Sequence, residues 1–269
     1  MDGGAARVDL FYNTYANFSG RIHTAIRQET YGQDIGQNSW VTVDEYDRYI
    51  EGLKLDAGSR VLEVASGAGG PALHLARRTG CSVTGIDANF NGVAAAMKAA
   101  SRAGLTARVS FQVADATATL PFESGSFDAL LCIDSMNHFP DRVATLREWW
   151  RVLRKGGRAV FTDPVVVTGP VTSEDIVQRS SIGLFVFVPV GLNEELIVKA
   201  GFKSVMRRDA TDNAVLIARR WRDARRRYCD ELIPVEGEGR YYGVQDFLAA
   251  VRRLTSERRL SRIEYLVEK

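Results

Sequence analysis

The sequence predicts an α/β fold in which a mostly parallel β-sheet carries helices on both faces. Two observations lead to this prediction. Short apolar runs alternate with amphipathic stretches between about residue 60 and about residue 165, and a repeated strand–helix–strand order is typical of a parallel sheet. A glycine-rich turn also joins the first apolar run to the first amphipathic stretch. Ligands bind such sheets at the carboxyl ends of the strands.

Five runs are expected to form the buried strands, because each is short, apolar and bounded by Gly, Asp or Pro. They are Val61–Ala65, Ser82–Ile86, Val109–Val113, Ala129–Ile133 and Ala159–Thr162. Three amphipathic stretches between them predict helices, over Ala72–Arg78, Val93–Ala103 and Val143–Leu153. A lysine and two glycines follow the last of these stretches, as is common where a helix ends.

The flanking segments are expected to cover this core. Residues 1–57 have helical patterns and many aromatic residues, Phe11 and Tyr12 among them. Further helical patterns near 213–229 and 244–257 separate a strand predicted at Lys203–Arg208 from a final strand at Ser261–Val267. We therefore predict an N-terminal helical lid (1–57), a core (58–211), a helical cap (212–258) and a final core strand (259–269).

The composition excludes several classes of protein. The 269-residue chain is 45% apolar and 25% charged, with a formal net charge of +2, and this balance gives no argument for a nucleic-acid or membrane partner. No apolar run is long enough to cross a membrane, and residues 1–7 lack a signal-peptide pattern. Cys81, Cys132 and Cys229 have no zinc-ligand spacing, so we expect reduced thiols, no metal and a cytoplasmic location.

The glycine-rich turn has the features of a nucleotide cofactor site. Gly67 and Gly69 let the backbone approach a ligand closely, and Pro71 suits the first turn of the following helix. The spacing Gly67-x-Gly69-x-x-Ala72 fits a dinucleotide pattern. An acidic residue four positions before the first glycine, Glu63, instead fits the motif of S-adenosylmethionine (SAM) sites. Both interpretations, and a tight turn that binds no ligand, are open on these residues alone.

Carboxylates near the turn favour SAM. Asp87 ends the second strand and can accept hydrogen bonds from ribose hydroxyls, which both cofactors have. Asp115 follows the third strand and can accept from an adenine amino group, and Glu63 can pair with the α-ammonium group, which NAD lacks. A nicotinamide-dependent oxidoreductase stays an alternative, and it would require a hydride-transfer site such as a Tyr-x-x-x-Lys pair beside the cofactor.

The core resembles the class I SAM-dependent methyltransferases in four stretches. These are Glu63–Gly70, Asp87, Ala114–Ala116 with Leu120–Phe122, and Phe127–Asp128 leading to Arg151–Gly157. The last resembles the family's RVLKPGG signature, with Arg154-Lys155 in place of Lys-Pro. The resemblance implies a Rossmann-like seven-stranded sheet, mostly parallel, with an antiparallel last strand. It also implies binding of SAM, and of its product S-adenosylhomocysteine, by a set of ten residues: Glu63, Ala65, Gly67, Gly69, Asp87, Ala88, Asp115, Ala116, Ile133 and Ser135.

The lid and cap resemble those of the small-molecule branch, which includes sugar and natural-product O-methyltransferases and phosphoethanolamine- and tocopherol-type enzymes. The acceptor is therefore expected to be a small molecule rather than a nucleic acid. Four aromatic or polar residues are predicted to line its site, together with the apolar run 182–188: Gln37, Trp40, Tyr241 and Tyr242. Core packing would explain them equally well. The arginines of 219–227 are expected on a solvated helix face.

The segment Cys132–Arg142 resembles the ES-x-x-HMPD segment of sugar and natural-product O-methyltransferases, whose histidine is the general base. This resemblance assigns His138 as the base and a hydroxyl as the acceptor, and Asp163, at the family's acidic position after the fifth strand, as its assistant. The structural alternatives are a histidine that caps the next helix or simply packs there, and an aspartate that forms a turn before Pro164. N- or C-methylation and a non-catalytic SAM-binding protein also stay open.

Overall fold

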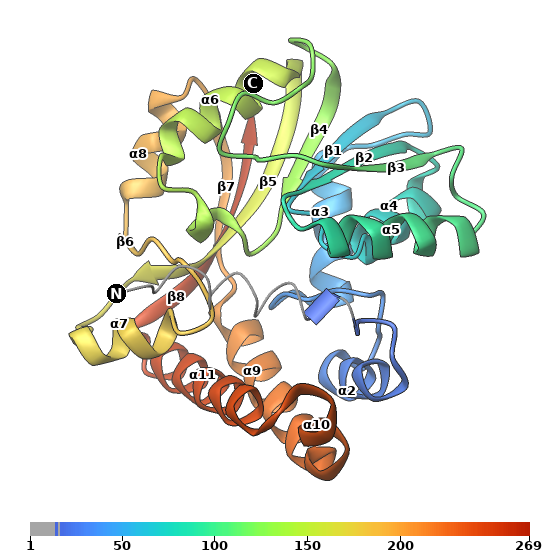
Figure 1. The fold of residues 1–269 in the computed structure, drawn as a ribbon. Coiled ribbons are helices and arrows are strands. Elements are labelled where there is room, and N and C mark those ends of the chain that lie inside the picture. Colours follow the sequence, from blue (N-terminus) through green and yellow to red (C-terminus); the bar gives the residue numbers. More distant parts are fainter. Residues whose placement is uncertain (1–13, 16) are drawn as a thin grey trace.

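A mostly parallel sheet forms the centre of the protein (Figure 1). The computed structural model describes Thr14, Tyr15 and residues 17–269, so Phe11 and Tyr12 of the predicted lid lie outside the described residues. The strand order is β3-β2-β1-β4-β5-β8-β7, and β8 runs antiparallel to both of its neighbours. The strands are β1 (Arg60–Val64), β2 (Ser82–Asp87), β3 (Val109–Val113), β4 (Phe127–Cys132), β5 (Leu153–Val167), β7 (Lys203–Asp209) and β8 (Leu260–Glu268).

The predicted fold class is therefore confirmed, and the described residues add one short strand, β6 (Val188–Pro189), which pairs with the end of β5. The five core strands lie close to their expected positions, although β5 is much longer than predicted. Its additional residues pair with β8, which begins beside the end of β5. The antiparallel partner thus extends a strand that the apolar pattern marks only at its centre.

Helices cover both faces of the sheet. One face carries α3 (Val43–Leu53), α4 (Gly70–Thr79) and α5 (Phe90–Arg102), and the other carries α6 (Arg142–Val152) and α8 (Leu192–Lys199). Side chains alternate between the two faces along each strand. In β4, for example, Leu131 packs with the first group of helices and Leu130 with the second. The result is a three-layer core.

The cap consists of α9 (Thr211–Arg227), α10 (Cys229–Glu236) and α11 (Glu238–Ser256), which lie between β7 and β8 in the sequence. Because β8 follows α11 directly and pairs with the last residues of β5, the cap stands at the carboxyl end of the parallel strands. Helix α2 (Arg21–Tyr31) of the N-terminal segment packs beside it. None of the helices that the structure describes is long and apolar enough to cross a membrane.

Two helices were not expected from the sequence. Helix α7 (Ser173–Arg179) is too short to show a period, although Thr172 and Asp175 form a capping box at its start. Helix α10 contains Pro234, which argues against a helix interior.

Candidate active site

The glycine-rich turn between β1 and α4 adopts left-handed backbone conformations. The φ angles are 57° at Ala65, 53° at Gly67 and 76° at Gly69, and glycine adopts such values without steric cost. A Cβ atom on Gly69 would lie 2.5 Å from Cζ of Phe111, inside the core. A Cβ atom on Gly67 would lie 2.6 Å from the hydroxyl of Tyr15, which belongs to the N-terminal segment. One glycine therefore fits the turn to the core, and the other lies against the lid.

Asp87 ties the end of β2 to this turn. Its Oδ2 accepts a hydrogen bond from the backbone N–H of Gly67 at 2.8 Å, and its Oδ1 accepts from Asn89 N–H at 2.7 Å. Burial raises the pKa of the Asp87 carboxyl, and these two backbone hydrogen bonds oppose the rise. Asp115 lies after β3, is exposed, and accepts from the backbone of Thr117 at 2.8 Å. The two predicted alanines follow these carboxylates directly in the sequence. Ala88, after Asp87, is exposed, and Ala116, after Asp115, is half-buried.

Buried polar atoms around the turn lack partners. The Oε1 atom of Glu63 lies 3.4 Å from the Tyr46 hydroxyl, while its Oε2 has no hydrogen-bond partner among the described residues. The buried hydroxyl of Ser66 also lacks one among them. Burial raises the pKa of Glu63 to about 8. Because buried polar groups are normally hydrogen-bonded, these atoms fit a polar ligand bound at the turn, as the cofactor prediction requires.

The end of β4 is held by Asp134, which has a left-handed φ of 54°. Its Oδ1 accepts from Arg262 Nε at 2.6 Å, and its Oδ2 accepts from the backbone N–H of Trp40 at 2.7 Å. Ile133 and Ser135, the predicted cofactor neighbours, flank it and are half-buried. The edge of the sheet is thereby fastened to the lid and to β8.

His138 lies in a short 3₁₀ helix, η1 (Met136–His138), after β4. Its Nδ1 is 2.8 Å from the carbonyl oxygen of Leu184. A carbonyl can only accept, so Nδ1 carries the hydrogen and Nε2 is the atom that can take up a proton. Burial lowers the pKa of His138, the charge of Arg179 adds to this effect, and the hydrogen bond to Leu184 opposes it. The imidazole is therefore neutral near pH 7.

The carboxylate of Asp141 caps the helix that follows His138, accepting from Ala144 N–H at 3.0 Å. The helix-cap alternative for His138 is therefore wrong. The imidazole instead lies against the ring of Phe185, with 5.0 Å between the ring centroids.

Asp163 is completely buried and is held by two polar side chains. Its Oδ2 is ion-paired with Arg142 and accepts from the Asn193 side chain at 2.8 Å. Arg142 also donates to the carbonyl oxygen of Val186 at 2.7 Å. This pair thus holds the segment 182–188 against the loop that carries His138. The contacts favour a positioning role, and the predicted catalytic assistance stays a prediction.

The predicted acceptor residues are spread over the lid and cap. Trp40 is buried, with its ring centroid 6.1 Å from that of Trp221. Gln37 is buried and organises its own loop by accepting from Ile35 N–H at 2.8 Å. Tyr241 is buried between α2 and the cap, whereas Tyr242 is 56% exposed. Trp40 thus packs in an aromatic cluster of lid and cap, and the roles of all four residues in acceptor binding stay predictions.

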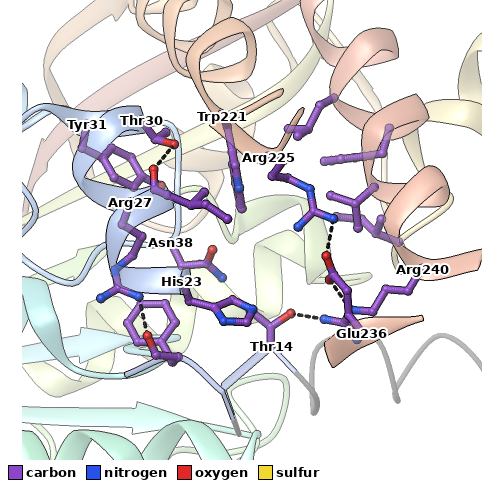
Figure 2. A pocket seen from close by; sticks show the side chains of 16 residues that line it. Thr14, His23, Arg27, Thr30, Tyr31, Asn38, Trp221, Arg225, Glu236 and Arg240 are labelled. Atoms are coloured by element: carbon purple, nitrogen blue, oxygen red, sulfur yellow. Dashed lines mark hydrogen bonds and ion pairs between the residues drawn. The ribbon is translucent and has the colours of Figure 1, made fainter. Parts of the chain in front are cut away.

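A cavity of about 100 Å³ lies between α2 and the cap helices (Figure 2). Its apolar lining includes Tyr31, Trp221 and Phe247. At its polar end Glu236 accepts from Arg225 Nη2 at 2.6 Å and from Arg240 Nε at 3.2 Å. Arg225 is therefore a buried ion-pair partner, and the solvated face expected for this stretch of arginines is wrong at this position.

The cavity connects to the glycine-rich turn through two side chains. Asn38 lines the cavity and hydrogen-bonds Tyr15, and Tyr15 lies against Gly67. The sequence did not reveal this cavity, because α10, which supplies Glu236, contains a proline and shows no helical signal.

Residues 62–161 match a family described as a methyltransferase domain. Residues 62–161 therefore belong to this family of methyltransferase domains. Methyltransferase GfsG of Streptomyces halstedii is 44% identical over 120 residues, which cover 45% of this chain and 43% of that protein. The 27-O-demethylrifamycin SV methyltransferase of Amycolatopsis mediterranei (strain S699) is 37% identical over 149 residues, which cover 55% of this chain and 54% of that one. The matches thus span about half the length of these relatives.

The fold also matches solved structures over nearly the whole chain. The [4+2]-cyclase SpnF superposes with a TM-score of 0.74 and 25% identity, covering 97% of this chain and 95% of that one. The likeness in fold thus extends beyond residues 62–161 and includes the lid and cap of this chain. Since SpnF is described as a cyclase, the likeness by itself does not fix the reaction.

Proposed function

We propose that the protein is a SAM-dependent methyltransferase that methylates a hydroxyl oxygen of a small molecule, with His138 as general base. The observation that carries the proposal is the state of His138. It is a neutral imidazole with its hydrogen on Nδ1, so Nε2 is basic, and it stands at the carboxyl edge of a methyltransferase core. A hydroxyl needs a base because it must lose its proton as the methyl group arrives.

The chain holds the cofactor at the glycine-rich turn in this proposal. Asp87 and Asp115 bind the adenosine, Glu63 pairs with the α-ammonium group, and the backbone of Gly67 and Gly69 lies against the ligand. The bound cofactor supplies an electrophilic methyl group on a sulfonium. The orphaned oxygen of Glu63 and the unpartnered hydroxyl of Ser66, judged among the described residues, support this placement.

The remaining residues align the acceptor and exclude water, which are the main tasks in an in-line methyl transfer. Asp163 and Arg142 orient the loop that carries His138, and Leu184 fixes the imidazole tautomer. The described part of the N-terminal segment up to residue 57 acts as a lid over the core in this proposal, and residues 212–258 act as a cap. The name of the rifamycin relative, which specifies an oxygen position, supports a hydroxyl acceptor over an amine.

Calorimetric titration with SAM, S-adenosylhomocysteine and NADH tests the cofactor. We expect the two adenosyl ligands to bind and NADH not to bind, and Asp87→Ala to weaken binding at least tenfold. Asp209→Ala is the matched control, because Asp209 also ends a strand and accepts from the backbone N–H two residues later, at 2.9 Å. NADH binding alone would refute the proposal in favour of the oxidoreductase.

Transfer of labelled methyl groups to a library of hydroxylated and amino small molecules tests the reaction. Replacing His138 with Gln should lower kcat by about 10²- to 10⁴-fold, the usual contribution of a general base, and leave S-adenosylhomocysteine affinity unchanged. Full turnover by His138→Gln would remove the base assignment. Tight cofactor binding without methyl transfer to any acceptor would favour a non-catalytic or cyclase-like protein.

A further inference from the structure

Arg179, the last residue of α7, is a buried cation that contacts no counterion among the described residues. Its side chain is 1% exposed. Its Nε and Nη1 atoms have no hydrogen-bond partner in the described part of the chain, and no ion pair to it is found there. Burial lowers the pKa of its guanidinium to about 10, so the group is still charged at neutral pH. Buried charges in proteins are otherwise paired or bind a ligand.

Three aromatic rings surround this cation. The guanidinium carbon lies 4.8 Å from the ring centroid of Phe185, 5.1 Å from that of Phe247 and 5.9 Å from that of Trp40. The rings come from the loop beside His138, from cap helix α11 and from the lid. They attract the positive charge, but a ring face does not replace the planar hydrogen bonds that a guanidinium makes with an oxyanion.

The two carboxylates whose negative charge acts on Arg179 already form ion pairs with other arginines. Asp134 and Asp163 both act on its pKa, yet Asp134 is paired with Arg262 and Asp163 with Arg142. Arg142 and Arg262 are as buried as Arg179, and each has its own acid. Of these three buried arginines, Arg179 is the one whose positive charge is not paired with a carboxylate in the part of the chain that the structure describes.

Arg179 also shares its surroundings with the proposed base. Both the Arg179 guanidinium and the His138 imidazole lie on the ring of Phe185. A group bound to Arg179 would therefore be separated from His138 only by the ring of Phe185. The proposed reaction takes place at His138.

We propose that Arg179 binds an anionic oxygen group of the acceptor, either a carboxylate or an ionised acidic hydroxyl, on an otherwise apolar and flat molecule. The planar N–H donors of arginine suit such a group, and the aromatic rings suit a flat apolar body. This inference rests on the proposed function in one respect, namely that the bound molecule is the methyl acceptor. The anion site itself can be tested without methyl transfer.

The competing explanation is that Arg179 fastens the cap to the lid through its three rings. The two roles differ in their effect on stability. Arg179→Met removes an uncompensated buried charge and keeps a similar volume, so a recognition residue predicts an unchanged or higher melting temperature. A fastening role predicts a lower melting temperature and no change in ligand binding.

The experiment measures thermal shift and affinity for benzoate, with benzamide as the uncharged probe of the same shape, in the presence of saturating S-adenosylhomocysteine. We expect benzoate to raise the melting temperature of the wild type and benzamide to have little effect. Arg179→Met should weaken benzoate at least tenfold, and Arg179→Lys should retain part of the affinity because it keeps the charge without the planar donors.

Arg225→Met is the matched control, because Arg225 is also buried and lies over a ring, Tyr241 at 5.4 Å, but is paired with Glu236. This variant should lose stability and keep benzoate binding. Loss of benzoate binding in Arg225→Met but not in Arg179→Met would overturn the proposal and place the anion in the cavity between α2 and the cap. Equal affinity of the wild type for both probes would also overturn it.

Calorimetry with S-adenosylhomocysteine on the same proteins separates the two proposals. If the wild type binds this ligand but not benzoate, the Arg179 proposal fails while the methyltransferase proposal stands. If benzoate binds through Arg179 and S-adenosylhomocysteine does not bind, the proposed function fails while the anion site stands.

Discussion

The guanidinium of Arg262 joins two buried carboxylates, donating from Nε to Asp134 Oδ1 at 2.6 Å and from Nη1 to Glu45 Oε1 at 2.6 Å. Arg262 belongs to β8, Glu45 to α3, and Asp134 follows β4. Asn213 of cap helix α9 donates to the second oxygen of Glu45 at 2.8 Å. One buried network therefore connects the last strand, the lid, the cap and the edge of the sheet that carries the candidate site.

Replacing Arg262 with Leu should lower the free energy of unfolding by about 3–5 kcal/mol, because both carboxylates would stay buried without a counterion. Urea denaturation measures the change. The control is Arg207→Leu on β7, whose pair with Glu194 is partly exposed to solvent and should contribute less than about 1 kcal/mol. Equal stabilities of the two variants would show that the network does not stabilise the fold.

Gly70→Ala should separate the lid from the glycine-rich turn. A Cβ atom there would lie 2.6 Å from Gly36 Cα and would also clash with the carbonyl oxygen of Ile35. We expect a loss of about 1–3 kcal/mol from overpacking, measured by thermal denaturation, with weaker S-adenosylhomocysteine binding. Gly243→Ala in α11 has open space around it, so it should raise stability by roughly 0.5–1 kcal/mol. A stabilised Gly70→Ala protein would show that the lid does not need this close approach.

The sequence predicted the core well because residues close together in the chain determine its strands and turns. Apolar runs mark β1 to β4, and the glycines at 67 and 69 mark a turn whose φ angles require them. The positions of Asp87 and Asp115 at strand ends follow directly, since parallel strands end at one edge. These features are set by residues close together in the chain.

The arginines at the site were not predicted, because nothing local marks an arginine as buried. Arg262 stands in a strand whose neighbours β5 and β7 cover both edges, so its burial depends on the whole sheet. Arg179 meets Phe247 only after α11 has folded over the core. Charged residues are almost never fully buried unless paired, and pairing between distant segments is invisible in a single sequence. The same holds for the cavity that Glu236 and Arg225 close.

Glu63 should release a proton when SAM binds. Its pKa of about 8 in the free protein means that the carboxyl is mostly protonated at pH 7, whereas pairing with an ammonium group requires the ionised form. Close to one proton should therefore be released at pH 7, and affinity should rise by up to about tenfold per pH unit from pH 6 to 7.5. Calorimetry in buffers of different ionisation enthalpy measures the proton count.

The Glu63→Gln variant should bind more weakly, release no proton and show an affinity independent of pH in this range. Without ligand, the raised pKa of Glu63 favours the folded state below the ordinary glutamate pKa, and this stabilisation is lost as pH rises toward 8. Glu63→Gln should therefore flatten that part of the pH–stability profile. Unchanged proton release in the variant would assign the ammonium contact to another residue.

The pKa of His138 should lie below 6.5 and should rise when Arg179 is replaced. Burial lowers it first, and the Arg179 charge lowers it further, so Arg179→Met removes one of the effects that disfavour the imidazolium form. An NMR titration of the three histidines, with His138 assigned through His138→Gln, measures the shift without any acceptor. Arg222→Met, which removes a cap arginine that does not act on His138, is the control.

A general base must be neutral to accept a proton, so turnover should fall about tenfold per pH unit below the pKa of His138. The acid limb of the pH profile should move to higher pH in Arg179→Met. An identical His138 pKa in the wild type and in Arg179→Met would show that the charge of Arg179 does not act on the proposed base.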